Sequence, residues 1–169
     1  MLTLGVRGLQ HTSSDWFDDP VNATTHAIVM SIILQSTLFA MLHYHSPGSS
    51  AVSLANLFFG GIAASLNVMV AGGSVWLGVG WHFSWNIMMG HVLGRSTSGI
   101  PMSCAVVNVV PHPDSSYVKY HGGVFGPEQG VLAPMAYILG MILVIWVYGL
   151  EEMIAWRAYL VTDLTNLQR

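Results

Sequence analysis

The sequence has very few charged side chains. Only 8% of its 169 residues are Asp, Glu, Lys or Arg, whereas an ordinary soluble domain has about 25%. Hydrophobic residues make up 53%, and the mean hydropathy is +0.56. So few charges cannot cover the surface of a soluble chain of this size, and so apolar a composition excludes intrinsic disorder. These properties indicate an integral membrane protein of about one domain's length.

Basic residues and cysteine are also scarce. Five Lys and Arg stand against eight Asp and Glu, a formal net charge of −3. Five scattered cations cannot form the basic patch that nucleic-acid binding requires, so we expect no nucleic-acid partner. The single cysteine, Cys104, excludes an intramolecular disulfide framework and a zinc–cysteine cluster. We expect neither a metal nor a cofactor.

Four long apolar segments contain no charged residue. A helix needs about 20 mostly apolar residues to span the bilayer. Four stretches approach this length, namely residues 26–43, 51–71, 74–93 and 131–150. The sequence therefore predicts an all-α fold, an integral membrane helical bundle with about four transmembrane helices that crosses the lipid bilayer several times.

The segment between the third and fourth apolar stretches is long and polar. Residues 95–130 are rich in Pro and Gly and show little helical periodicity. Loops of this length are usually functional or re-entrant. We expect such a loop within one membrane-embedded domain that covers residues 1–169.

Small residues recur at helical spacing in the second segment. Gly60 with Ala64, and Gly61 with Ser65, form two pairs four residues apart. Such pairs let helix backbones approach closely in lipid, where hydrophobicity cannot drive association. We expect them at helix–helix contacts.

A narrow stripe of small and polar residues marks the third segment. Gly78, His82, Asn86 and Gly90 recur every four residues, so an α-helix would place them on one face, toward the protein interior. Polar groups inside a bilayer are costly and suggest function by default.

Two histidines and one amide could form a hydrolytic site. His43 ends the first segment, on a helix that can pack against the helix of His82 and Asn86. A neutral imidazole can accept a proton from water, while a second imidazole and an amide can donate hydrogen bonds to an oxyanion. The plainer alternative is that these groups join helices, a contact worth about 0.6 kcal/mol. Spacing alone leaves both interpretations open.

Two short motifs resemble those of a known peptidase family. Phe39-x-x-x-His43 resembles the second motif of the CAAX prenyl endopeptidase and bacteriocin-processing (CPBP, or Abi) family, and residues 81–86 (WHFSWN) resemble its third motif, HxxxN. Residues 122–130 (GGVFGPEQG) resemble a glycine-rich segment of the family, in which we expect Glu128 to be structural. The resemblance covers roughly residues 5–150.

The resemblance implies an intramembrane endopeptidase that forms no covalent intermediate. In this family a glutamate of the first motif, EExxxR, and the second-motif histidine, here His43, activate a water. The third-motif pair, here His82 and Asn86, stabilises the oxyanion. The implied substrates are prenylated C-terminal tails or other hydrophobic, membrane-associated peptides, and the implied location is a prokaryotic plasma membrane.

The first motif of the family is incomplete in this sequence. Residues 6–9 (VRGL) resemble its end, but its two glutamates would fall at Leu2 and Thr3. We expect a chain that is N-terminally incomplete, or degenerate and inactive, or that uses a carboxylate from elsewhere.

Glu151 and Glu152, followed by Arg157, are the candidates for such a substitution. The five-residue separation of Glu152 and Arg157 places them about 140° apart on a helix, whereas EExxxR pairs residues on one face. This spacing favours a charged cap at the end of the last membrane helix.

Two other functions remain open at this stage. A catalytically silent member of the same fold would bind a hydrophobic peptide or a partner, as an immunity or scaffold protein. A haem protein would use His43 and His82 as axial ligands, but this leaves Asn86 and the stripe of small residues unexplained.

Overall fold

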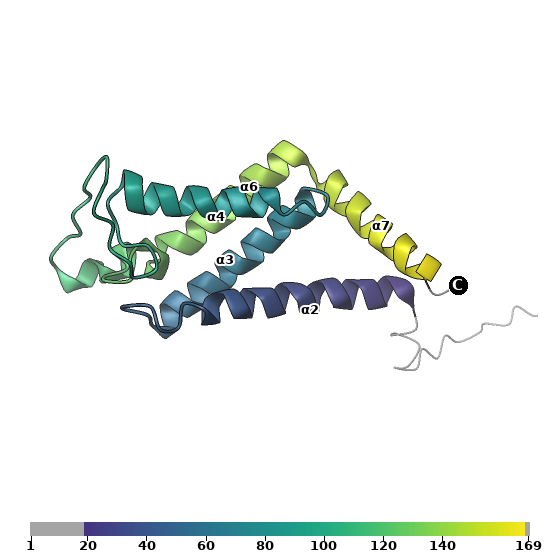
Figure 1. Cartoon of the computed structure of the whole chain (residues 1–169), viewed down its shortest axis with the longest axis horizontal. Coiled ribbons are helices and arrows are strands. Elements are labelled where there is room, and N and C mark those ends of the chain that lie inside the picture. Colours follow the sequence, from purple (N-terminus) through teal and green to yellow (C-terminus); the bar gives the residue numbers. More distant parts are fainter. Residues whose placement is uncertain (1–18, 168–169) are drawn as a thin grey trace, which may run out of the picture.

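The computed structural model describes residues 19–167, with side chains other than those of residues 20 and 164–167. The all-α fold predicted from the sequence is confirmed. Figure 1 shows α3 running obliquely between α2 and α4, while α7 returns from the end of α6 toward the start of α2. The main helical elements are α2 (Pro20–Met41), α3 (Ala51–Val70), α4 (Trp76–Asn86), the π-helical turn η1 (Ile87–Val92), α6 (Leu132–Tyr148) and α7 (Leu150–Leu167).

Local signals set the ends of α2. The side chain of Asp19 caps its first turn, and Pro20 occupies the first helical position, where its missing N–H costs nothing. The helix therefore begins earlier than the predicted apolar segment. It ends at Met41, so His43 lies in the turn that follows rather than on the helix.

Two of these helices are long and apolar enough to cross a membrane. They comprise Val21–Met41 and Ala51–Val70. Helices α6 and α7 are long and apolar enough only when they are taken together, as one span that is bent by 81°. The bend lies at Gly149, whose φ of +80° interrupts the helix. The third predicted segment forms α4, of 11 residues, followed by the 6 residues of η1, together shorter than the about 20 that a span requires. The described residues thus contain two or three candidate spans, and the predicted count of four is not confirmed.

Glycines on α3 allow its neighbours to approach closely. A Cβ atom at Gly61 would lie 2.8 Å from the Cα atom of Ser36 on α2, and one at Gly60 would lie 3.2 Å from the ring of Tyr137 on α6. The small residues of α3 therefore lie at helix contacts, as their spacing predicts.

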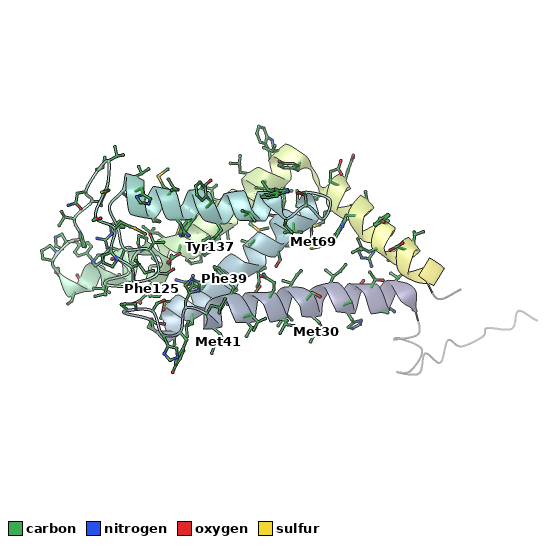
Figure 2. All side chains as sticks on the ribbon, in the orientation of Figure 1. Met30, Phe39, Met41, Met69, Phe125 and Tyr137 are labelled. Carbon is green, nitrogen blue, oxygen red and sulfur yellow. The ribbon has the colours of Figure 1, made fainter. Side chains whose placement is uncertain are left out.

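Buried apolar side chains form two small clusters, in which Phe125 and Tyr137 are labelled in Figure 2. One cluster joins α2, α3 and the loop, and the other joins α3 and α6. Their members are Ala40, Leu57 and Phe125 in the first, and Ala63, Ala133 and Tyr137 in the second.

Large apolar side chains also cover the outward surfaces of α2 and α6. Leu34 is 61% exposed and Trp146 is 79% exposed. In a membrane protein such faces are in contact with lipid, because a soluble monomer rarely exposes apolar patches this large.

The predicted loop is packed against the bundle. It contains only the short turns η2 (Ser115–Tyr117), α5 (Val118–His121) and η3 (Pro127–Gln129). The backbone N–H groups of residues 106 and 107 donate to the carbonyls of residues 91 and 92, which attaches the loop to η1. The loop is therefore placed beside the end of the helix that bears His82 and Asn86.

We predict that replacing Gly61 by Ala destabilises the bundle, because its Cβ atom would collide with the backbone of α2 at Ser36. Such overpacking costs about 1–3 kcal/mol, measurable as a lower thermal unfolding midpoint in detergent. Gly80→Ala is the matched control, since nothing lies within 4 Å of a Cβ atom there. Equal midpoints for the two variants would contradict the close contact.

Candidate active site

The ring of His43 is fixed by the backbone of the preceding helix. Its Nδ1 atom donates a hydrogen bond to the carbonyl oxygen of Phe39, with a separation of 2.7 Å. A carbonyl oxygen can only accept, so the neutral ring carries its proton on Nδ1. The Nε2 atom of His43 is left with a lone pair that can accept a proton.

His82 and Asn86 interact across one turn of α4, as their four-residue spacing predicts. The side-chain Nδ2 of Asn86 donates to Nε2 of His82, with a separation of 3.1 Å. Because an amide nitrogen only donates, the neutral ring of His82 carries its proton on Nδ1. Both histidines are thus held in the Nδ1-protonated tautomer, but Nε2 is free in His43 and occupied in His82.

Phe39 brings the two histidines together. The centroid of its ring lies 5.0 Å from that of His43 and 5.4 Å from that of His82, which it meets edge to face. Of the three residues predicted from the sequence, His43 and His82 therefore meet at one aromatic side chain, and Asn86 is bonded to His82.

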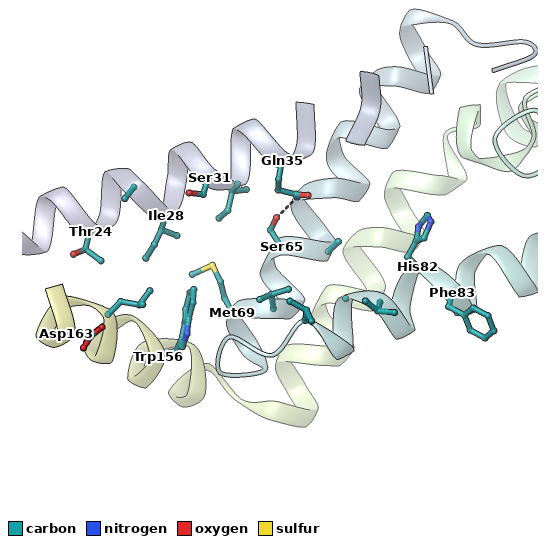
Figure 3. A pocket seen from close by; sticks show the side chains of 18 of the residues that line it. Thr24, Ile28, Ser31, Gln35, Ser65, Met69, His82, Phe83, Trp156 and Asp163 are labelled. Carbon is teal, nitrogen blue, oxygen red and sulfur yellow. Dashed lines mark hydrogen bonds between the residues drawn. The ribbon is translucent and has the colours of Figure 1, made fainter. Parts of the chain in front are cut away.

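A groove of about 950 Å³ passes beside His82 and Asn86, between α2, α3, α4 and α7. Its wall is mostly apolar, and Figure 3 shows Met69 and Trp156 lining its middle. Asp163 of α7 lies at the end opposite to His82. Grooves of this volume bind ligands of several hundred Å³ or more, so an extended apolar chain fits.

A second cavity, of about 60 Å³, adjoins the groove. His82 and Gln35 line both spaces, and Glu128 and Tyr137 line only the smaller one. The amide of Gln35 donates to Ser65 on α3, a contact drawn in Figure 3. His82 therefore lies at the junction between the apolar groove and a smaller, more polar space.

Glu128 lies in this environment, although the sequence indicated only a structural role for it. Its side chain is only 2% exposed and accepts a hydrogen bond from the indole Nε1 of Trp85, at 3.1 Å. It also accepts from the backbone N–H and the hydroxyl of Ser98, each at 2.7 Å. A carboxylate within a glycine-rich segment was the available signal, but its partners are distant in sequence.

The proposed substitutes for the missing glutamate do not reach the site. Glu151 and Glu152 are exposed in the first turn of α7 and line neither cavity. Arg157 donates to the hydroxyl of Thr25, at 2.8 Å, and so attaches α7 to α2. Residues 2–9, which would contain the first motif, lie outside the described residues.

Within the described part of the chain, two carboxylates line these cavities. They are Asp163 in the groove and Glu128 in the smaller space. Among the same residues, no group of three or more His, Cys, Asp or Glu side chains is arranged to hold a metal ion.

Comparison with known families agrees with the motifs. Residues 5–88 match the model of the family described as type II CAAX prenyl endopeptidase Rce1-like, a segment that includes His43, His82 and Asn86. The match confirms the family resemblance seen in the sequence, and together with the apolar helices it identifies a membrane protein related to CAAX-type intramembrane proteases. No curated protein and no solved structure matches the chain.

We predict that Asn86→Leu releases the ring of His82, because the variant removes the only donor to its Nε2 atom among the described residues. Two-bond ¹H–¹⁵N correlation spectra of the protein in detergent should then show His82 as a mixture of tautomers. His43 is the internal control, since its bond to the Phe39 carbonyl is untouched. An unchanged His82 pattern in the variant would contradict the proposed hydrogen bond.

Proposed function

Starting from the match of residues 5–88 to the type II CAAX prenyl endopeptidase family, we propose that this chain acts in intramembrane endoproteolysis. The observation that supports it best is the hydrogen bonding of His43 and His82, because both rings are protonated on Nδ1 but a different ring nitrogen is left free in each. His43 presents a lone pair and His82 an N–H group. His82 lines the groove that fits an apolar substrate, and His43 is connected to it through Phe39 rather than lining either cavity.

His43 is the proposed base. Its free Nε2 atom accepts a proton from a water as that water attacks the scissile carbonyl carbon. The same proton then passes from His43 to the departing amine, so His43 returns to its starting tautomer. The hydrogen bond to the Phe39 carbonyl keeps the ring oriented and stabilises the charged form during the reaction.

His82 and Asn86 are the proposed donors to the oxyanion. The Nδ1–H group of His82 has no hydrogen bond to any described residue, and one of the two amide hydrogens of Asn86 is left over after its bond to His82. Preorganised donors of this kind stabilise the negative charge that develops on the carbonyl oxygen.

The proposed substrate is a prenylated or otherwise hydrophobic peptide in the membrane. The groove extends from His82 past Trp156 of α7, and its wall is formed mainly by apolar side chains. A hydrocarbon chain lying along the groove would place a nearby peptide bond at the His82 end. The family also implies a glutamate that assists His43, for which no described residue of the groove wall near His82 is a candidate.

We predict that the detergent-purified chain cleaves a quenched fluorescent, farnesylated CAAX peptide. His43→Ala should lower kcat by about 10²- to 10⁴-fold through loss of the base, and His82→Ala by about 10²- to 10³-fold through loss of an oxyanion donor. His45→Ala is the matched control, because His45 is exposed and its ring contacts Tyr44 rather than Phe39.

These reactions are run with and without a chelator. Full activity in either alanine variant would refute the assigned role of that residue. No cleavage by a folded, monodisperse parent protein would refute the peptidase activity of this chain and favour a silent, peptide-binding member of the fold.

We predict that Val79→Trp weakens substrate binding, because Val79 lines the groove and a larger side chain there occupies part of it. KM should rise about tenfold, equivalent to about 1.4 kcal/mol, with kcat little changed. Val147→Trp on α6 is the control, since Val147 is 62% exposed and lies outside the groove wall. An equal rise in KM for both variants would show that the substrate does not use this groove.

A further inference from the structure

A buried carboxylate without a cationic partner adjoins the proposed site. Glu128 is 2% exposed, and its hydrogen-bond donors, the indole of Trp85 and the two groups of Ser98, are all neutral. Arg95 is buried in the same loop, at 8% exposure, but donates to backbone carbonyls instead. The loop thus keeps an acidic group apart from the nearby cation.

Burial of an unpaired carboxylate is costly unless several donors compensate it. Three donors meet at Glu128, one on Oε1 and two on Oε2. Glutamine would place an NH₂ group against one of these donors, so the arrangement is specific for a carboxylate. An apolar side chain would leave these buried donors of Trp85 and Ser98 without an acceptor, so the carboxylate is what joins α4 to the Ser98 turn.

The contacts of Glu128 lead directly to the residues of the site. Trp85 lies between His82 and Asn86 in the sequence of α4, and its ring also packs on Tyr137 of α6, with centroids 5.0 Å apart. Glu128 and His82 line the same small cavity. The carboxylate therefore fixes the helix turn from which both proposed oxyanion donors project.

The backbone of the turn that contains Glu128 is attached to α3. The side-chain amide of Asn56 donates to the backbone carbonyls of Glu128 and Gly130, at 2.9 and 3.1 Å. The bonds from Asn56 hold the backbone of this turn, whereas Trp85 and Ser98 hold the Glu128 carboxylate. A substitution can remove either set of bonds without the other, which makes the role of the carboxylate testable.

We propose that Glu128 is a positioning residue of the site, which orients His82 and Asn86 by fixing Trp85 and connecting α4 to the Ser98 turn. The inference rests on the proposed function, in which His82 and Asn86 bind the oxyanion. Glu128 does not touch the substrate and acts through Trp85. The segment between α4 and α6 is then a support for the site, rather than a connection alone.

The test compares the variants Glu128→Gln and Trp85→Phe, singly and together. Trp85→Phe removes the indole donor but keeps an aromatic ring against Tyr137. Each single variant should lower kcat by about 10- to 100-fold, the cost of a small misplacement of reacting groups, with KM within about twofold of the parent. The double variant should be no worse than the poorer single one, because both remove the same contact.

Two controls separate positioning from general stability. Asn56→Ala removes the loop anchor and should lower the unfolding midpoint while kcat changes less than threefold. Glu152→Gln removes an exposed carboxylate and should change neither quantity. The proposal is overturned if Glu128→Gln resembles Asn56→Ala, or if the effects of Glu128→Gln and Trp85→Phe on kcat simply multiply.

A spectroscopic measurement tests the proposal without relying on activity. In ¹H–¹⁵N spectra in detergent, the indole signal of Trp85 is assigned by its loss in Trp85→Phe. Glu128→Gln should shift that signal together with the side-chain signals of Asn86 and His82, whereas Asn56→Ala should leave them in place. Unshifted Asn86 and His82 signals in a folded Glu128→Gln protein would overturn the proposal. If the parent cleaves no peptide, the proposed function fails and this spectrum alone decides the role of Glu128.

Discussion

The close approach of α2 and α3 is the contact on which the remaining structure depends. At Gly61 the two backbones meet with no room for a side chain. This contact places Gln35 and Phe39 of α2 beside α4, and it fixes the end of α2 from which His43 follows. The same central helix packs against α4, α6 and η3, so one small residue determines the relative placement of all the groups in the site. Lipid offers no hydrophobic driving force that could replace such packing.

The sequence was a good guide wherever the determining forces are local. Apolar runs without charge predicted α3 and α6 nearly to their ends, and four-residue spacing predicted the contact of His82 with Asn86. The start of α2 was placed too late, because the Asp19 cap extends the helix beyond its apolar part. His43 was singled out by its place at the end of the first apolar segment and then by the family motif.

Features that arise from distant contacts were not foreseen. The environment of Glu128 is created by residues 30 and 43 positions away, which no periodicity reveals. The sequence also did not predict α7 as a separate helix. Gly149, with its positive φ, ends α6 within the predicted segment 131–150, and a second helix begins at Leu150. Interior placement of the polar stripe was only partly correct: Gly78 and Gly90 are buried, whereas His82 opens onto the groove. Composition cannot distinguish a helix face that contacts lipid from one that borders a cavity.

The π-helical turn after Asn86 has a consequence for the phase of the helix. Each hydrogen-bonded ring of η1 contains one more residue than an α-helical ring, so residues within η1 lag increasingly behind their α-helical positions, by about 100° at its end. Gly90 therefore does not extend the face of His82 and Asn86 into the groove but is buried against Met102 and Thr97 of the loop. The change of phase thus turns the end of this helix toward the loop, while its earlier part borders the groove.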